Sequence, residues 1–122
     1  MTDNNEEKPR AVIQEYVDAC TVGSVDRLQA IFHPEALMSG FLQGEYYMGS
    51  PKPFFDAVQN SPAPDNNGDE YQGKITNVEI AGNTASVTLK EAGFMGTNFT
   101  DYFHLVLVDD DWKIVSKTFQ QE

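Results

Sequence analysis

One acidic side chain in an otherwise apolar row is the feature of this sequence that points most directly to chemistry. Residues 99–108 alternate in the manner of a β-strand, so Asp101 shares a face with Phe103 and Leu105. A carboxylate among apolar side chains costs free energy unless it is paired or protonated. Asp101 is therefore the first candidate for a catalytic or ligand-binding group.

A lysine of the next strand is predicted to lie on the same face of the sheet. An acidic turn, 109–111, joins the two strands, and if it leaves three residues unpaired, Lys117 falls opposite Asp101 or one diagonal away. This register puts Phe119 on the same face and Ile114 on the other. The two charged groups could bind a polar edge of a ligand, or they could form a structural ion pair between strands.

Composition and charge exclude several classes of protein. The chain has 122 residues, enough for one domain, and a formal net charge of −11, with its eight Lys and Arg residues scattered. No basic cluster could neutralise a phosphate backbone, so we expect no nucleic-acid partner. The longest apolar runs are too short to span a membrane and the N-terminus does not resemble a signal peptide, so we expect a cytoplasmic protein without a membrane partner.

Neither a metal nor another cofactor is expected. The single cysteine, Cys20, excludes an internal disulfide, and His33 and His104 lie far apart without a carboxylate pattern that would suggest a metal site. The sequence also lacks a nucleophile elbow, a phosphate-binding glycine loop and a dinucleotide fingerprint.

The elements that must position these groups begin with three predicted helices. A stripe of apolar residues follows Pro9, Gly23 ends this first helix, and Ser24 caps the next one. Pro34 ends the second helix, because the residue before a proline is pushed out of helical geometry. A third helix is predicted over 51–60.

Six predicted strands account for most of the remaining chain. The first two are short and lie between the second and third helices, and the other four follow one another to the end of the sequence. This order predicts an α+β fold with its helices on one face of a curved, mostly antiparallel sheet. The predicted strands are 36–42, 45–48, 71–81, 84–91 and the two strands of the hairpin around 109–111.

The chain divides into a tail and one domain. Residues 1–8 are expected to form a disordered or loosely ordered tail, and residues 9–122 a single domain. The segment 61–69 is polar and rich in Pro, Asn and Gly, and it is long for a loop in a compact domain. We expect it to be the most mobile internal segment and to serve as a lid or as a contact with a partner.

Four segments give the chain a resemblance to a known superfamily. They are 12–17 in the first helix, 31–36 after the second, and 101–105 and 112–119 in the final hairpin. In this order they resemble the nuclear transport factor two-like superfamily, and more closely its putative lumazine-binding and polyketide-cyclase-like branch. The resemblance implies a cone-shaped half-barrel with three N-terminal helices on the concave face of a six-stranded sheet. It also implies a pocket between these layers and a homodimer formed through the convex face.

A more distant resemblance, to ketosteroid isomerase, implies roles for two residues. Tyr16 and Asp101 match the tyrosine and the protonated aspartate that donate hydrogen bonds to an enolate in that enzyme. Gly40 stands where the isomerase has its aspartate base, and Lys117 stands where it has an apolar pocket residue. An ammonium beside Asp101 would keep this acid ionised, so the same reaction is not expected here. Tyr16 could equally be a core tyrosine whose hydroxyl has a structural partner.

The predicted pocket combines a polar centre with an apolar wall. We expect it to bind a small, partly aromatic molecule. Two alternatives stay open: an isomerase, dehydratase or cyclase in which Asp101 or Tyr16 moves a proton, and a non-catalytic interaction module. The candidate polar groups are Tyr16, Asp101 and Lys117, and the candidate wall is Met38, Tyr47, Phe54, Phe55, Phe103 and Phe119.

The opposite face of the final hairpin is predicted to form a dimer interface. Tyr102, His104, Val106 and Val108 alternate with the pocket row, and Ile114 joins them if the register is as predicted. A half-apolar outer face of this size is usually covered, so we expect a homodimer.

Overall fold

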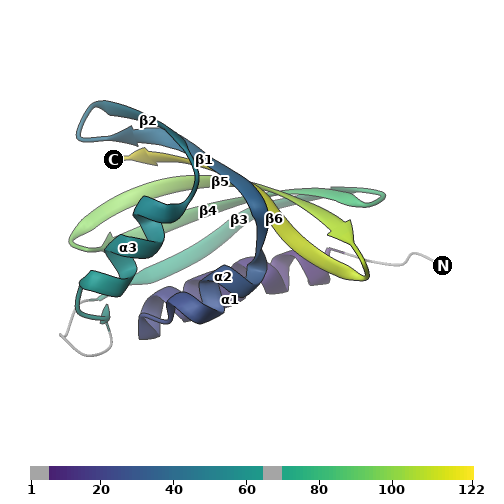
Figure 1. Ribbon diagram of the computed structural model, residues 1–122, viewed down its shortest axis with the longest axis horizontal. Coiled ribbons are helices and arrows are strands. Elements are labelled where there is room, and N and C mark those ends of the chain that lie inside the picture. Colours follow the sequence, from purple (N-terminus) through teal and green to yellow (C-terminus); the bar gives the residue numbers. More distant parts are fainter. Residues whose placement is uncertain (1–5, 65–69) are drawn as a thin grey trace.

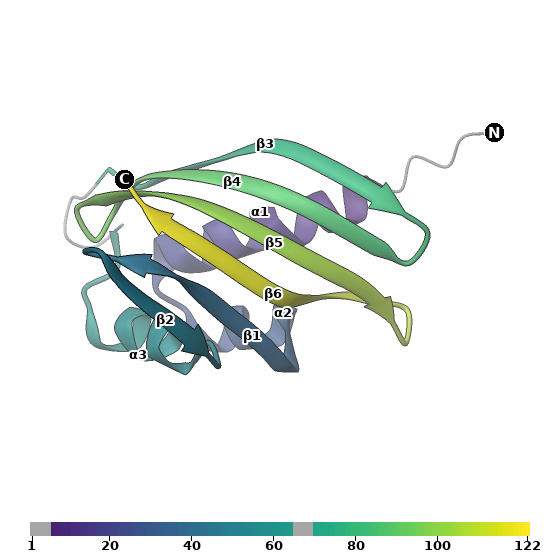
Figure 2. The same ribbon diagram turned by 90° about the horizontal axis from the view of Figure 1, so that it is seen from above.

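One curved sheet of six strands forms the frame of the molecule, and the helices lie against one of its faces (Figure 1, Figure 2). The computed structural model describes residues 6–64 and 70–122. The elements are α1 (Glu7–Val22), α2 (Val25–Ile31), β1 (Phe32–Leu42), β2 (Glu45–Gly49), α3 (Lys52–Asn60), β3 (Gln72–Ala81), β4 (Thr84–Phe94), β5 (Thr97–Val108) and β6 (Asp111–Gln121).

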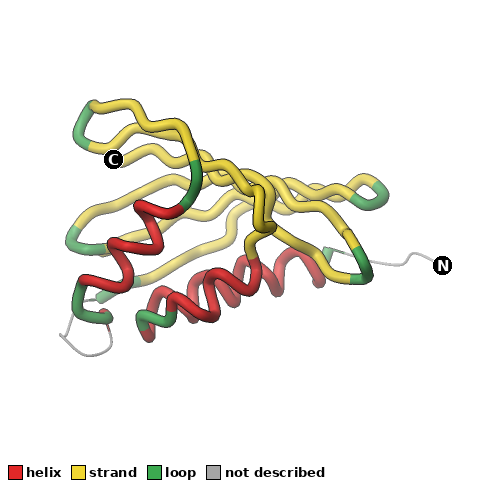
Figure 3. Tube along the Cα trace, in the orientation of Figure 1, coloured by secondary structure: helices red, strands yellow, loops and turns green. Residues whose placement is uncertain are grey.

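The strand order is β2-β1-β6-β5-β4-β3, and all neighbours are antiparallel except β1 and β6, which are parallel. Coloured by secondary structure, the chain shows its helices gathered on the concave side of the strands (Figure 3). The predicted fold class is therefore confirmed.

The helix ends follow the signals in the sequence. Gly23 ends α1 in a left-handed conformation with φ of 72°, and Ser24 Oγ accepts a hydrogen bond from the Arg27 N–H at the start of α2. Helix α1 begins at Glu7, earlier than the predicted start at Pro9. Within the described ranges, no helix is both long and apolar enough to cross a membrane.

Parts of two predicted segments, residues 1–5 of the tail and 65–69 of the 61–69 loop, lie outside the described residues. The expected mobility of that loop stays a prediction.

Strand β1 starts at Phe32 and is longer than predicted. Phe32 pairs in parallel with Ile114 of β6, and the register then shifts before Leu37 pairs with Ser116. Pro34, which lacks a backbone N–H, lies in the irregular stretch between these paired segments and costs the sheet little there. The proline ends α2 as predicted, but the chain enters the sheet at once.

The core lies between the helices and the concave face of the sheet. Ala85, Val87 and Leu89 of β4 face it, as the alternation of this strand predicts. The largest fully buried side chains include Ile13, Tyr16, Leu28, Phe103, Leu105 and Ile114.

The final hairpin turns more tightly than predicted. Val108 pairs with Asp111, so the turn leaves only Asp109 and Asp110 unpaired, and both have positive φ, 52° and 68°. The prediction of three unpaired residues was wrong. Two positive φ values in a two-residue loop are typical of a turn whose twist matches that of the flanking strands.

A bulge in β6 then changes which side chains face the core. Ser116 and Ile114 pair with consecutive residues of β5, which leaves Val115 unpaired. The extra residue returns Lys117 to the concave side, opposite Phe103. Ile114, predicted to lie on the outer face, is instead fully buried in the core, because the two-residue turn pairs it with the inward-facing Leu105.

Candidate functional site

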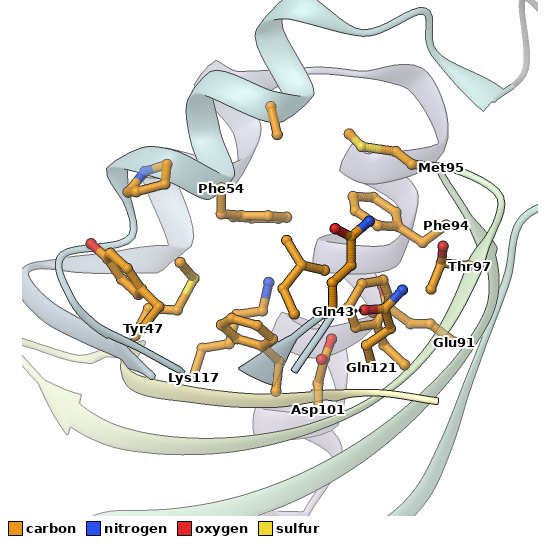
Figure 4. A pocket seen from close by; sticks show the side chains of 16 residues that line it. Gln43, Tyr47, Phe54, Glu91, Phe94, Met95, Thr97, Asp101, Lys117 and Gln121 are labelled. Atoms are coloured by element: carbon orange, nitrogen blue, oxygen red, sulfur yellow. Dashed lines mark hydrogen bonds between the residues drawn. The ribbon is translucent and has the colours of Figure 1, made fainter. Parts of the chain in front are cut away.

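A cavity of about 390 Å³ opens between α3, the β1–β2 hairpin and the concave face of β4, β5 and β6 (Figure 4). Its volume falls within the range of small-molecule sites. The wall is largely aromatic and apolar, with Gln43, Thr97 and Gln121 among its polar members. The apolar lining includes Met38, Tyr47, Phe54, Phe94, Phe99 and Phe119. Three ionisable side chains, Glu91, Asp101 and Lys117, also line the cavity.

Asp101 lies on the sheet side of this cavity, and in the described part of the chain no group donates a hydrogen bond to it. On β5 it stands between Leu89 of β4 and Phe119 of β6, and it is only 1% exposed. Neither of its side-chain oxygens has a hydrogen-bond partner among the described residues. Buried polar atoms are nearly always paired in folded proteins, so a carboxyl in this state is typical of a functional group.

Lys117 extends into the same space, but aromatic rings hold its ammonium group. In Figure 4 its side chain rises from β6 toward Phe54, and Nζ lies 3.5 Å from the centre of the Phe54 ring. The rings of Tyr16 and Phe119 are 5.2 and 5.8 Å from the same atom. Such cation–π contacts stabilise a charge that water reaches poorly.

Lys117 and Asp101 do not form the ion pair that the sequence analysis gave as one alternative. Over residues 6–64 and 70–122, the ion pairs are Arg27–Glu15, Lys52–Asp56 and Lys90–Glu122. Lys117 lies one diagonal from Asp101 in the hairpin, so the two charges line one cavity without direct contact. Both groups are thus open to a bound molecule.

Glu91 is a second buried acid of the site, and the sequence analysis missed it. It is 5% exposed, and the Tyr71 hydroxyl donates a hydrogen bond to its Oε2 at 2.5 Å. Burial raises the pKa of the Glu91 carboxyl well above its usual value. The charge of Asp101 raises this pKa further, while the charge of Lys117 and the hydrogen bond from Tyr71 act in the opposite direction.

A signal for Glu91 was present in the sequence. The alternation that buries Ala85, Val87 and Leu89 continues in phase to residue 91. Glu91 and Asp101 are the two acids of the site, and within the described chain no group of three or more His, Cys, Asp and Glu side chains could hold a metal ion.

Tyr16 lies beneath the cavity and not in its wall. Its ring stacks on Phe54 at 5.5 Å and meets Phe103 edge-on at 4.9 Å. Burial, followed by the charges of Glu91 and Asp101, raises the pKa of its hydroxyl well above the usual value. Tyr16 therefore supports the ring that carries Lys117.

The structure brings six of the nine predicted site residues to the cavity. Phe103 belongs to the layer beneath it with Tyr16, and Phe55 packs edge-on against Phe32. The six that line the cavity are Met38, Tyr47, Phe54, Asp101, Lys117 and Phe119.

Gly40, where the isomerase has its base, leaves no room for a side chain. A Cβ atom there would lie 2.1 Å from the carbonyl oxygen of Phe119 and 2.7 Å from its ring. The close approach of β1 to β6 thus requires glycine. A base in this cavity has to come from another strand.

Comparison with known proteins identifies the family. The sequence matches the family described as putative lumazine-binding over residues 4–120. The chain belongs to this family. A relative named aldolase FrzH, from Cladobotryum sp, is 33% identical over 105 residues, which cover 85% of this chain and 81% of the relative.

Solved structures share the fold at lower identity. An NTF2-like protein of unknown function from Methylobacillus flagellatus KT has a TM-score of 0.89 at 24% identity, covering 100% of this chain and 95% of that one. One from Shewanella baltica OS155 has a TM-score of 0.87 at 23% identity, with 100% and 98% covered. These values show a common fold, and the family match over residues 4–120 confirms the superfamily resemblance.

Proposed function

We propose that the protein binds a small carbonyl compound in this cavity and moves a proton at the carbon next to the carbonyl group. The observation that supports this most directly is Asp101, a buried carboxyl that borders the cavity without a hydrogen-bond donor among the described residues. Leaving a buried polar group unpaired costs about 1–3 kcal/mol. A carboxylate in that state is a suitable base for a proton on carbon.

The surroundings of Asp101 suit this reaction. Aromatic side chains, among them Phe54 and Phe99, line the cavity, and Asp101 itself is only 1% exposed to water. Electrostatic interactions are stronger in such a place than in solvent. The Lys117 ammonium lies on the same cavity, where it would stabilise the negative charge that develops on a carbonyl oxygen as the proton leaves.

The name of the relative supports the same class of reaction. Aldol chemistry begins with removal of a proton beside a carbonyl group, and the relative called an aldolase is 33% identical to this chain. The family description, lumazine-binding, supports a small-molecule ligand without requiring that one. The proposal takes from both names only the class of ligand and the first step.

Asp101 is a better candidate than Tyr16 for moving the proton. Tyr16 is absent from the cavity wall, and its raised pKa makes its proton difficult to remove. The cavity also counts against the interaction module, because such a module has no need for an unfilled interior with an unpaired acid.

The test has two steps. A thermal-shift screen with small ketones, aldehydes and lumazine identifies compounds that stabilise the protein; saturation to 100 times Kd would add about 2.7 kcal/mol to the free energy of unfolding. Each carbonyl compound that binds is then incubated with the protein in D2O, and NMR follows deuterium uptake at the carbon next to the carbonyl.

Asp101→Asn should abolish this deuterium uptake while the protein stays folded, because the amide keeps the shape of the side chain but cannot take the proton. Asp26→Asn, an exposed change in α2, is the matched control and should behave as the unchanged protein does. Binding of lumazine without deuterium uptake from any bound carbonyl compound would make this a non-catalytic binding protein.

A further inference from the structure

We infer that Glu91 and Asp101 share one proton, and that Glu91 gives this proton to the carbonyl oxygen of the bound molecule while Asp101 takes one from the neighbouring carbon. The inference rests on the proposed function and adds to it a second catalytic residue, Glu91, with Tyr71 as its positioning residue.

The register of the sheet brings the two acids together. Leu89 of β4 pairs with Asp101, and Glu91, two positions further on, pairs with Phe99. Glu91 and Asp101 are therefore diagonal neighbours on one face of adjacent strands, a spacing that long side chains bridge. Both are buried, 5% and 1% exposed, and both line the cavity.

Hydrogen bonding accounts for where the shared proton lies. Two carboxylates cannot donate to each other, and like charges this close resist being ionised together. Glu91 Oε2 already accepts from the Tyr71 hydroxyl. A proton on the other Glu91 oxygen would supply the donor that Asp101 lacks, and would leave the second Asp101 oxygen for the ligand.

The charged and titratable groups around Glu91 favour this assignment as a set. Asp101 on β5 and Lys117 on β6 face it from the sheet, Tyr71 precedes β3, and Tyr16 and Cys20 belong to α1. Lys117 alone among them is a cation, so one negative charge in the acid pair is balanced and a second is not. Burial and the charge of Asp101 accordingly raise the pKa of Glu91 well above its usual value.

The pair then supplies an acid and a base in one step. The Asp101 carboxylate takes the proton from carbon, and the electron pair of that C–H bond forms the new C=C bond. The carbonyl π electrons move to oxygen, which takes the Glu91 proton, so the products are an enol, a protonated Asp101 and an ionised Glu91. The total charge of the site does not change, and the reverse transfer restores the starting state.

Infrared difference spectroscopy tests the shared proton without any ligand. At neutral pH the protein should show the C=O band of one protonated, buried carboxylic acid. Glu91→Gln should remove this band. In Asp101→Asn the negative charge of Asp101 is gone, so Glu91 should lose its proton, and the band should disappear, at a lower pH than in the unchanged protein. Glu79→Gln, an exposed change on β3, should leave it unaltered. A neutral-pH spectrum of the unchanged protein without a protonated acid overturns the inference, whether or not the variants fold.

Deuterium exchange separates this inference from the proposed function. If Glu91 is the acid, Glu91→Gln should slow deuterium uptake into a bound ketone by about 10²-fold or more, and Tyr71→Phe should shift its pH profile while leaving the fold intact. Uptake that depends on Asp101 but not on Glu91 would keep the proposed function and refute the pair. The infrared band without deuterium uptake from any carbonyl compound would keep the shared proton but refute the proton transfer to a ligand.

Discussion

At the scale of single residues, the site depends on where two acids fall in the alternation of two strands. Asp101 could be predicted, because it is flanked in phase by Phe103 and Leu105 in a strongly apolar strand. Glu91 lies in phase with a buried row too, but it is the last residue of the predicted strand, where a side chain can turn to solvent. Only the pairing of β4 beyond that residue and the Tyr71 hydroxyl place it inside.

The buried Glu91 carboxyl predicts that the protein loses stability as pH rises. Its pKa is raised in the folded state from an ordinary value of 4.5, so above that pH the folded protein holds a proton that the unfolded chain has lost. The free energy of unfolding is highest below this window and falls through it, by at most about 1.4 kcal/mol per pH unit. Urea denaturation at several pH values between about 5 and 8 gives the free energy of unfolding as a function of pH. This free energy should fall less steeply with pH for Glu91→Gln than for the unchanged protein, and equally steeply for Glu79→Gln. Equal slopes in all three proteins would contradict the burial of a protonated acid.

At the scale of elements, the β5–β6 hairpin determines which side chains enter the cavity. The sequence predicted Lys117 on the side of Asp101 from a three-residue turn, whereas the structure reaches this result with a two-residue turn and the bulge at Val115. A bulge has no clear signature in a single sequence, because any residue can be the unpaired one. The turn is one residue shorter than predicted, and this is why Ile114 was expected on the wrong face.

The turn itself offers a prediction. Asp109 and Asp110 both have positive φ, a conformation in which Asn and Gly are less strained than Asp. The double change Asp109→Asn and Asp110→Gly should raise the free energy of unfolding by about 1 kcal/mol, as measured by urea denaturation. Asp111→Asn removes a neighbouring charge at a position without positive φ, so it should raise the free energy of unfolding by less. An equal gain from Asp111→Asn would mean that charge repulsion, and not the backbone, limits the stability of this hairpin.

At the scale of the whole molecule, the order of elements determined the fold from the sequence, since helices and strands follow one another as in the family to which the chain belongs. The position of the cavity also follows from this order, because α3 lies on the concave side and supplies Phe54, which contacts Lys117 of β6. The polar side chains that line the cavity cannot be predicted from the order of elements, because they depend on the register of each strand pair. Six of nine predicted site residues reach the cavity for this reason, and the acid next to Asp101 was missed.

The convex face of the sheet predicts a homodimer. Phe41 of β1, Tyr46 of β2 and Tyr102 of β5 are 43%, 66% and 50% exposed there. The predicted outer residues His104 and Val108 are also exposed, and Val106 is half-buried. Covering this face would bury about 800 Å² per partner. Light scattering at micromolar concentration should give twice the mass of one chain, and Tyr46→Glu should lower it. The mass of a single chain in the unchanged protein would refute the dimer.

The central claim is that Asp101 takes a proton from the carbon next to a carbonyl group in the cavity. Deuterium uptake into a bound ketone, followed by NMR with the unchanged protein and with Asp101→Asn, tests it most directly. The account predicts uptake well above the rate in buffer for the unchanged protein, and the rate in buffer for the variant. Equal uptake by the two folded proteins would contradict it.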